Sequence, residues 1–208
     1  MKMLLISGMD FSGKTSVAKR IIEICPNTYK IQHKYLSIGD PLKDIRNNKK
    51  IYPVDEWVQF WKQVILNDIS EFKRYCQMGR YNNYDSILQD GLSAFKHLAM
   101  LKANTNNTNN DSLVVFEDAL HQYPSMDSIF LTASIEERKK RYEMRKLSKR
   151  TYSDQLLFSS QFSKIEDEYI KIIFNCFPHT LTIDTSTISL NEVAKIVLNQ
   201  FENRSFGE

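Results

Sequence analysis

The 208-residue chain has the length of one globular domain, which can bury roughly 70% of the surface that its unfolded form exposes. Its 42% hydrophobic and 12% aromatic residues exclude a disordered tail, and its few glycines and prolines exclude a collagen-like chain. A net charge of +3 is too small to indicate nucleic-acid binding by itself. We therefore expect a single α/β domain over residues 1–208, for the reasons that follow.

No apolar run approaches the ~18 residues of a membrane span, and residues 1–7 lack the length and the cleavage site of a signal peptide. Cys25, Cys76 and Cys176 form no paired motif, which favours free thiols over a disulfide framework or a zinc site. The sequence thus predicts a cytoplasmic protein without a membrane partner.

Short apolar runs separated by helical sequence predict a parallel sheet with crossover helices on both faces. The runs cover residues 2–7, 29–37, 86–90, 128–132 and 181–184. Helical spacing of apolar residues predicts one helix over residues 14–25 and a long one over about 53–75. This alternation is typical of an α/β fold.

Residues 112–118 end in Glu117-Asp118 after four apolar residues, which is also typical of the metal-binding strand of a P-loop ATPase. A parallel strand here would leave residues 119–127 to reach the next strand, fewer than the dozen or so that such a connection needs. We expect a helix over residues 112–121, with the strand as the alternative.

Residues 8–15 fit the pattern Gly-x-x-x-x-Gly-Lys-[Ser/Thr] between a predicted strand and a predicted helix. Two glycines let the backbone curl so that its N–H groups face a phosphate, which the positive end of the helix also attracts. Lys14 adds a charge on the outer phosphates, and Thr15 offers a hydroxyl to Mg²⁺. The residues expected around the phosphates are Gly8, Asp10, Phe11, Ser12, Gly13, Lys14, Thr15 and Ser16.

With Asp10 in third place, this loop resembles that of P-loop nucleoside and nucleotide kinases, and most closely the thymidylate-kinase-like family. In that family the acid contacts the sugar of the acceptor nucleotide, which implies the same role for Asp10. The resemblance also implies ATP and Mg²⁺ as cofactors and a five-stranded sheet in the order 2-3-1-4-5. A solvated loop carboxylate is the alternative, although a phosphate-gripping loop has no need of a repelling acid.

Residues 138–150 carry eight basic side chains in thirteen positions, after a capping box at residues 134–137. On a helix, Arg138, Arg141, Arg145 and Lys149 would form one stripe. The alternatives are a solvated basic helix and a nucleic-acid patch, the second disfavoured by the scarcity of interleaved aromatic residues.

This segment resembles the lid region of nucleoside monophosphate kinases, whose arginines close over the transferring phosphoryl group. The resemblance implies a basic helix and lid over about residues 134–153. It places Arg141 near the donor base and phosphates, and Arg145 and Arg150 on the mobile lid, with Arg141 and Arg145 as catalytic residues. Residues 184–186 look like the donor-base loop of the family.

The acceptor region is expected within about residues 34–100. Asp90 ends a predicted strand, where open α/β sheets hold ligands, so it could orient the acceptor, act as a catalytic base or hold Mg²⁺ through water; a helix cap is the alternative. The family has Asp-Arg where this chain has Asp90-Gly91. Lys34, Arg46 and Phe60 are the further acceptor-binding candidates.

The function favoured by the sequence is transfer of the ATP γ-phosphoryl group to a (deoxy)nucleoside monophosphate, with the nucleotide as a small-molecule partner. A nucleoside or small-molecule kinase with a hydroxyl acceptor remains open, because Asp90 could serve as its base. A P-loop ATPase switch is the rival from another class. No nucleic-acid partner is expected, and a homodimer is compatible with this reading.

Overall fold

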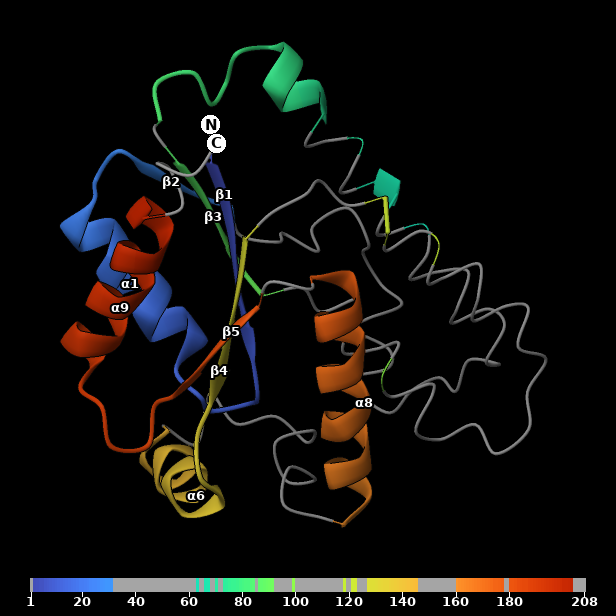
Figure 1. Ribbon diagram of the computed structural model, residues 1–208, viewed down its shortest axis with the longest axis vertical. Helices are drawn as coiled ribbons and strands as arrows, with labels where there is room; N and C mark the ends of the chain where they lie inside the picture. The colour runs from blue at the N-terminus through green and yellow to red at the C-terminus, as the bar shows by residue number, and fades with distance from the viewer. Residues whose placement is uncertain are drawn as a thin grey trace.

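The fold is known from a computed structural model, which describes residues 2–31, 63, 66–67, 70, 73–84, 86–91, 99, 118, 121–122, 127–145, 160–177 and 180–203. One parallel sheet lies between helices on its two faces (Figure 1). None of the helices within these ranges has both the length and the apolar composition needed to span a bilayer.

Five strands are hydrogen-bonded in the order β2-β3-β1-β4-β5, with every pair parallel. They are β1 (Lys2–Gly8), β2 (Thr28–Ile31), β3 (Ser86–Asp90), β4 (Asp127–Thr132) and β5 (Leu181–Asp184). The register pairs Ile6 with Asp90 and Thr132 with Asp184. The carboxyl ends of four strands therefore meet at one edge of the sheet.

Helix α1 (Lys14–Ile24) and helix α9 (Leu190–Asn203) cover one face of the sheet, side by side in Figure 1. Apolar residues recur along both helices at helical spacing, and their side chains pack against alternate residues of the strands. The core on this face contains Leu4, Ile6, Val17, Ala18, Ile21, Leu88, Ile129, Leu131, Ile183, Val193, Ala194 and Val197.

Helix α8 (Ser160–Cys176) covers the opposite face of the sheet (Figure 1). The ring of Phe130 on β4 lies 5.9 Å from that of Tyr169 and 6.1 Å from that of Phe174, between ring centroids. Helix α6 (Ile135–Met144) follows β4 and lies at the carboxyl edge of the sheet. The α/β class, the parallel sheet and its helices on both faces are thus confirmed.

Asp118 is helical and His121 lies in a turn, while residues 112–117 and 119–120 of the expected helix lie outside the described residues. Ser134 caps α6 as expected, because its hydroxyl accepts a hydrogen bond from the N–H of Glu137. The basic helix, however, ends earlier than its stripe of arginines predicts. Arg145 has an extended backbone (φ −71°, ψ 131°), so Arg145 does not continue the helical stripe.

A physical reason for this early end lies in the side chains. Like charges at neighbouring positions of one helix face repel, and leaving the helix lets the Arg145 guanidinium lie 5.6 Å from the centroid of the Phe11 ring. The remainder of the expected lid, residues 146–153, lies outside the described residues.

Candidate functional site

The loop after β1 leaves the sheet at Gly8, which packs directly against the backbone of β4. A Cβ atom on Gly8 would lie 2.2 Å from the carbonyl oxygen of Leu131, and φ of Gly8 is +142°. The N–H of Met9 then donates to the same oxygen at 3.0 Å. Only glycine permits this close approach of two strands, so Gly8 fixes where the loop begins.

The loop ends at Gly13, the N-cap of α1, whose φ of +96° is also left-handed. Lys14 curls back over the loop, and its Nζ donates to the carbonyl oxygens of Gly8 at 2.9 Å and Met9 at 2.7 Å. The loop thus closes on itself around an ammonium group. Its concave side combines this charge with the positive end of α1, which suits an anion.

Two arginines of α6 hold the next two carbonyl groups of the loop. Arg138 Nε donates to the carbonyl oxygen of Asp10 at 2.9 Å, and Arg141 NH1 donates to that of Phe11 at 3.0 Å. A peptide N–H points opposite to its C=O, so these bonds direct the N–H groups of Phe11 and Ser12 away from α6, and that of Ser12 donates to the Met9 carbonyl at 3.2 Å. The arginine side chains of the basic stripe therefore contact the backbone of the phosphate loop.

Phe11 sits between these two bonds and is the one non-glycine residue with positive φ in the described part of the chain (φ +62°). Its ring meets that of Tyr142 edge to face at a centroid distance of 5.6 Å, and the Arg145 guanidinium lies over it. A strained backbone persists only where its surroundings hold it, and here α6 supplies those surroundings.

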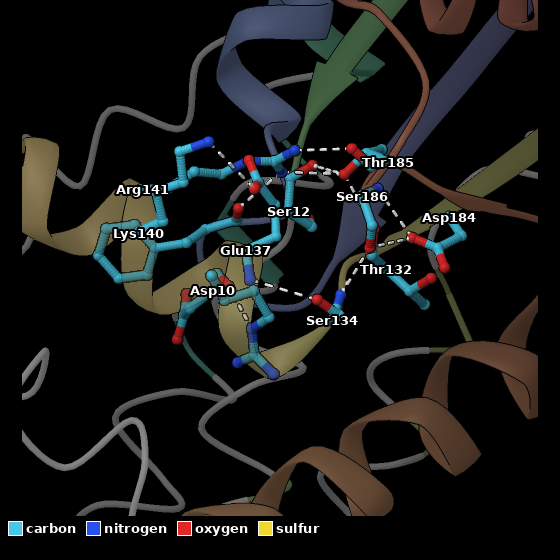
Figure 2. A network of polar contacts seen from close by, with 12 residues as sticks. Asp10, Ser12, Thr132, Ser134, Glu137, Lys140, Arg141, Asp184, Thr185 and Ser186 are labelled. Atoms are coloured by element: carbon cyan, nitrogen blue, oxygen red, sulfur yellow. Dashed lines mark hydrogen bonds and ion pairs between the residues drawn. The ribbon is translucent and has the colours of Figure 1, made fainter.

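Thr185 joins three parts of the site in Figure 2, where it lies beside Ser12 and Thr132. Its buried Oγ1 is 2.9 Å from the carbonyl oxygens of both Ser12 and Thr132, and it accepts a hydrogen bond from Arg141 NH1. Arg141 NH2 also donates to the Thr185 carbonyl at 2.7 Å, while its Nε donates to Glu137. The loop after β5 is therefore tied to the phosphate loop and to α6.

The same loop is tied to the N-terminus of α6. The Asp184 carboxylate accepts from the hydroxyl and the N–H of Ser186, and Ser186 Oγ accepts from the N–H of Ser134 at 2.7 Å (Figure 2). The hydrogen bonds from Ser186, first from its side chain and then from its backbone, hold the pKa of Asp184 below its ordinary value. The Asp184 carboxylate, through Ser186, thus connects the end of β5 to the N-terminus of α6.

Asp90 lies at the same edge, since its backbone pairs with Ile6, two residues before the phosphate loop begins. The chain turns at Gly91, whose φ is +76° and whose N–H donates to the Ile6 carbonyl at 2.9 Å. Gln89, buried in the sheet, holds this turn through a bond from Nε2 to the Gly91 carbonyl at 2.9 Å. Lys34, Arg46 and Phe60 lie outside the described residues.

A metal ion at this site would depend on the phosphate loop. Thr15 is exposed in the first turn of α1, where its hydroxyl can join the oxygens of a bound phosphate around Mg²⁺. The described ranges contain no cluster of three or more His, Cys, Asp or Glu side chains placed to hold a metal. The Thr15 hydroxyl therefore fits Mg²⁺ bound together with a nucleotide's phosphates.

Two residues of this site are absent from the sequence-based candidates. Arg138 belongs to the basic stripe, but its sequence position does not show that it is buried against Asp10. Its carboxylate partner, Glu166, lies on α8, and no sequence pattern pairs residues 28 positions apart. The helix itself does have a signal, because Ile165, Tyr169, Ile172 and Ile173 recur at helical spacing.

Solved kinase structures share this fold. Thymidylate kinase from Candida albicans matches with a TM-score of 0.66 and 17% identity, over 100% of this chain and 93% of that one. Deoxyadenosine kinase from M. mycoides, with the products dCMP and a flexible dCDP bound, matches with a TM-score of 0.57 and 15% identity, over 97% and 99%. Shikimate kinase from Acinetobacter baumannii matches with a TM-score of 0.52 and 14% identity, over 98% and 94%.

No protein-family model and no curated protein matches the sequence. At identities this low, the structural likenesses establish the fold, which is that of P-loop kinases such as thymidylate kinase. The resemblance noted at the phosphate loop is confirmed at this level.

Proposed function

We propose that this chain transfers the γ-phosphoryl group of ATP to the 5′-phosphate of a deoxynucleoside monophosphate. The observation that carries the proposal is the loop of residues 8–15, which combines the Lys14 ammonium group and the N-terminus of α1 with an acid, Asp10, of intermediate exposure. A loop that only grips a nucleotide gains nothing from a carboxylate beside the phosphates. A second substrate with hydroxyl groups gives that carboxylate a use.

On the donor side, phosphoryl transfer needs positioning and charge neutralisation more than covalent chemistry, because charge spreads over three equatorial oxygens. Lys14 would move from the carbonyls of Gly8 and Met9 onto the outer phosphates when ATP binds. Mg²⁺ bound with ATP would supply further charge, with Thr15 as its hydroxyl ligand. Arg141 and Arg145 border the same loop and are the proposed cations for the transferring group.

On the acceptor side, Asp10 would accept a hydrogen bond from a sugar hydroxyl. The acceptor phosphate is largely ionised at neutral pH, since its second pKa is about 6, so a strong catalytic base is not needed. Asp90, at the neighbouring strand end, is proposed to orient the acceptor. Solved structures of this fold include a thymidylate kinase and a deoxyadenosine kinase with the products dCMP and dCDP bound, which supports a deoxynucleoside or its monophosphate as the acceptor class.

The proposal is tested by a coupled ADP-release assay with Mg-ATP against all common nucleosides and nucleoside monophosphates. We expect acceptor-dependent ADP release with at least one deoxynucleoside monophosphate, and the diphosphate as product. Lys14→Ala is the control, because it removes charge from the phosphates and little packing. ADP release that is the same with and without every acceptor would contradict the proposal.

A hydroxyl-accepting kinase is the second candidate, favoured by the position of Asp90 at the carboxyl edge of the sheet. A nucleoside or small-molecule hydroxyl needs a base, and a carboxylate at that edge could provide it. The same screen separates the two, because the product would then be a monophosphate. Asp90→Asn should in that case lower kcat far more than it does with a phosphate acceptor.

A further inference from the structure

A buried ion pair links the phosphate loop to a helix on the far side of the sheet. Arg138 is only 3% exposed, and its two terminal nitrogens both pair with Glu166 of α8, one of them at 3.0 Å. The Glu166 side chain is 15% exposed. The third nitrogen, Nε, donates to the Asp10 carbonyl, and NH1 also lies 3.5 Å from Met9 Sδ.

Burial of a guanidinium group is unfavourable unless its charge and its donors are satisfied. Here the carboxylate neutralises the charge in a two-pronged geometry, which leaves Nε aimed at one backbone oxygen. Arg141 differs in both respects. It is 27% exposed and its carboxylate partner, Glu137, lies one turn away on the same helix.

We infer that Arg138, held by Glu166, is a positioning residue that fixes the Asp10 peptide and so aims the Asp10 carboxylate at the acceptor. The inference rests on the function proposed above. The geometric basis is that holding the Asp10 carbonyl fixes ψ of Asp10, and with it the position of the Cα–Cβ bond from which the carboxylate extends. The strained Phe11 comes next in the chain, and the carbonyl that Arg138 holds belongs to the peptide that joins Asp10 to Phe11.

One consequence is that two arginines of α6 have different roles. Arg138 acts through Asp10 on the acceptor, whereas Arg141 holds Phe11 and Thr185 and acts on the donor side. A second consequence is that a shift of α8 would change the acceptor site. Glu166 on α8 orients Arg138, and Arg138 in turn holds the Asp10 peptide.

The test is the double variant R138M/E166M, which replaces the pair by apolar side chains of similar length. Such replacements of a buried pair are often neutral for stability, so the fold should persist while the bond to Asp10 is lost. We expect kcat/KM for the acceptor to fall about 10- to 100-fold, because small misplacement of reacting groups has effects of this size. ADP affinity should change less than about threefold, given that donor contacts remain.

The matched control is E168Q/K171Q, which removes one acid and one base from the exposed ion pair on the same helix. It should leave both substrates unaffected. A general defect in α8 would instead affect R138M/E166M and the control alike, or would affect donor and acceptor equally. Either of these results overturns the inference.

The decisive readout is the coupling to Asp10. In an Asp10→Asn background, R138M/E166M should lower acceptor kcat/KM by less than about threefold more, because the carboxylate it positions is already gone. Additive losses would overturn the inference. Should R138M/E166M not fold, R138K keeps the charge but lacks the fork that serves both Glu166 and Asp10, and it is expected to show the same non-additivity.

Amide hydrogen exchange over residues 8–14 gives a readout that needs no acceptor. Exchange there should be faster in R138M/E166M than in the wild type and the control, with ADP bound in each case. If the wild type phosphorylates no acceptor, the proposed function fails while this readout still tests Arg138. Unchanged exchange overturns the positioning role whatever the substrate.

Discussion

Arg141 and Thr185 are joined by two hydrogen bonds, from NH1 to Oγ1 at 2.9 Å and from NH2 to the carbonyl oxygen at 2.7 Å. Thr185 Oγ1 in turn lies 2.9 Å from the carbonyl oxygen of Ser12. The helix after β4, the loop after β5 and the phosphate loop thus form one hydrogen-bonded unit. A substitution of Arg141, Thr185 or Ser12 should therefore alter nucleotide binding.

Arg141→Ala should lower kcat/KM for ATP about 10- to 1000-fold, because it removes a charge beside the donor and frees the carbonyls of Phe11 and Thr185. Arg145→Ala should have a similar effect on kcat only if Arg145 reaches the transferring phosphate. If Arg145 acts solely through the Phe11 ring, the loss should be about two- to fivefold. Steady-state kinetics measures both, with the exposed neighbour Lys140→Ala as control.

Thr185→Val keeps the shape of the side chain but leaves the buried carbonyl of Ser12 without a donor. The free energy of unfolding should fall by about 1–3 kcal/mol, the usual effect of an unsatisfied buried polar group. Thr185→Ser retains the hydroxyl, so its free energy of unfolding should fall by less. Urea unfolding of the three proteins checks this, and equal stability of Thr185→Val and wild type would show that the hydroxyl bond is unimportant.

Gly8→Ala should prevent stable folding, because the new Cβ would lie 2.2 Å from a backbone oxygen of β4 that cannot move aside. Gly91→Ala is the matched comparison. It also places a side chain at positive φ, yet no atom of the described residues lies within 4 Å of the new atom. Backbone strain alone should destabilise Gly91→Ala by about 1–2 kcal/mol. The midpoints of thermal unfolding of the two variants distinguish the effect of steric overlap at Gly8 from that of backbone strain at Gly91.

The lowered pKa of Asp184 leads us to expect that the free energy of unfolding depends on pH. Its pKa is lowered in the folded protein by hydrogen bonds from Ser186, so its stabilising contribution is complete above the unfolded pKa of about 3.9 and is lost as pH falls through the folded value. Ser186→Ala should therefore be less stable than wild type near neutral pH, and the difference should shrink in acid. Urea midpoints at several pH values below 6 test this, and a constant difference would count against the pairing.

Much of the scaffold could be predicted from the sequence, because it depends on local patterns. Apolar runs mark the strands, the glycines and Lys14 mark the phosphate loop, and Ser134 marks the start of α6. The end of α6 has no such local mark, and Arg145 at that end lies over the ring of Phe11, which is distant in sequence. The bonds of Thr185 and the pair between Arg138 and Glu166 likewise join distant segments, so no local pattern could reveal them.

The account's central claim is that one loop binds the donor through its backbone and the acceptor through Asp10. The kinetics of Asp10→Asn, with ATP and the acceptor varied separately, test it most directly. Loss of a charge-assisted hydrogen bond is worth roughly 1.5–3 kcal/mol, so acceptor kcat/KM should fall about 10- to 150-fold while ATP affinity stays unchanged or improves slightly. An acceptor analogue without the sugar 3′-hydroxyl should lose most of that sensitivity. Weakened ATP binding with unaltered acceptor kinetics would contradict the account.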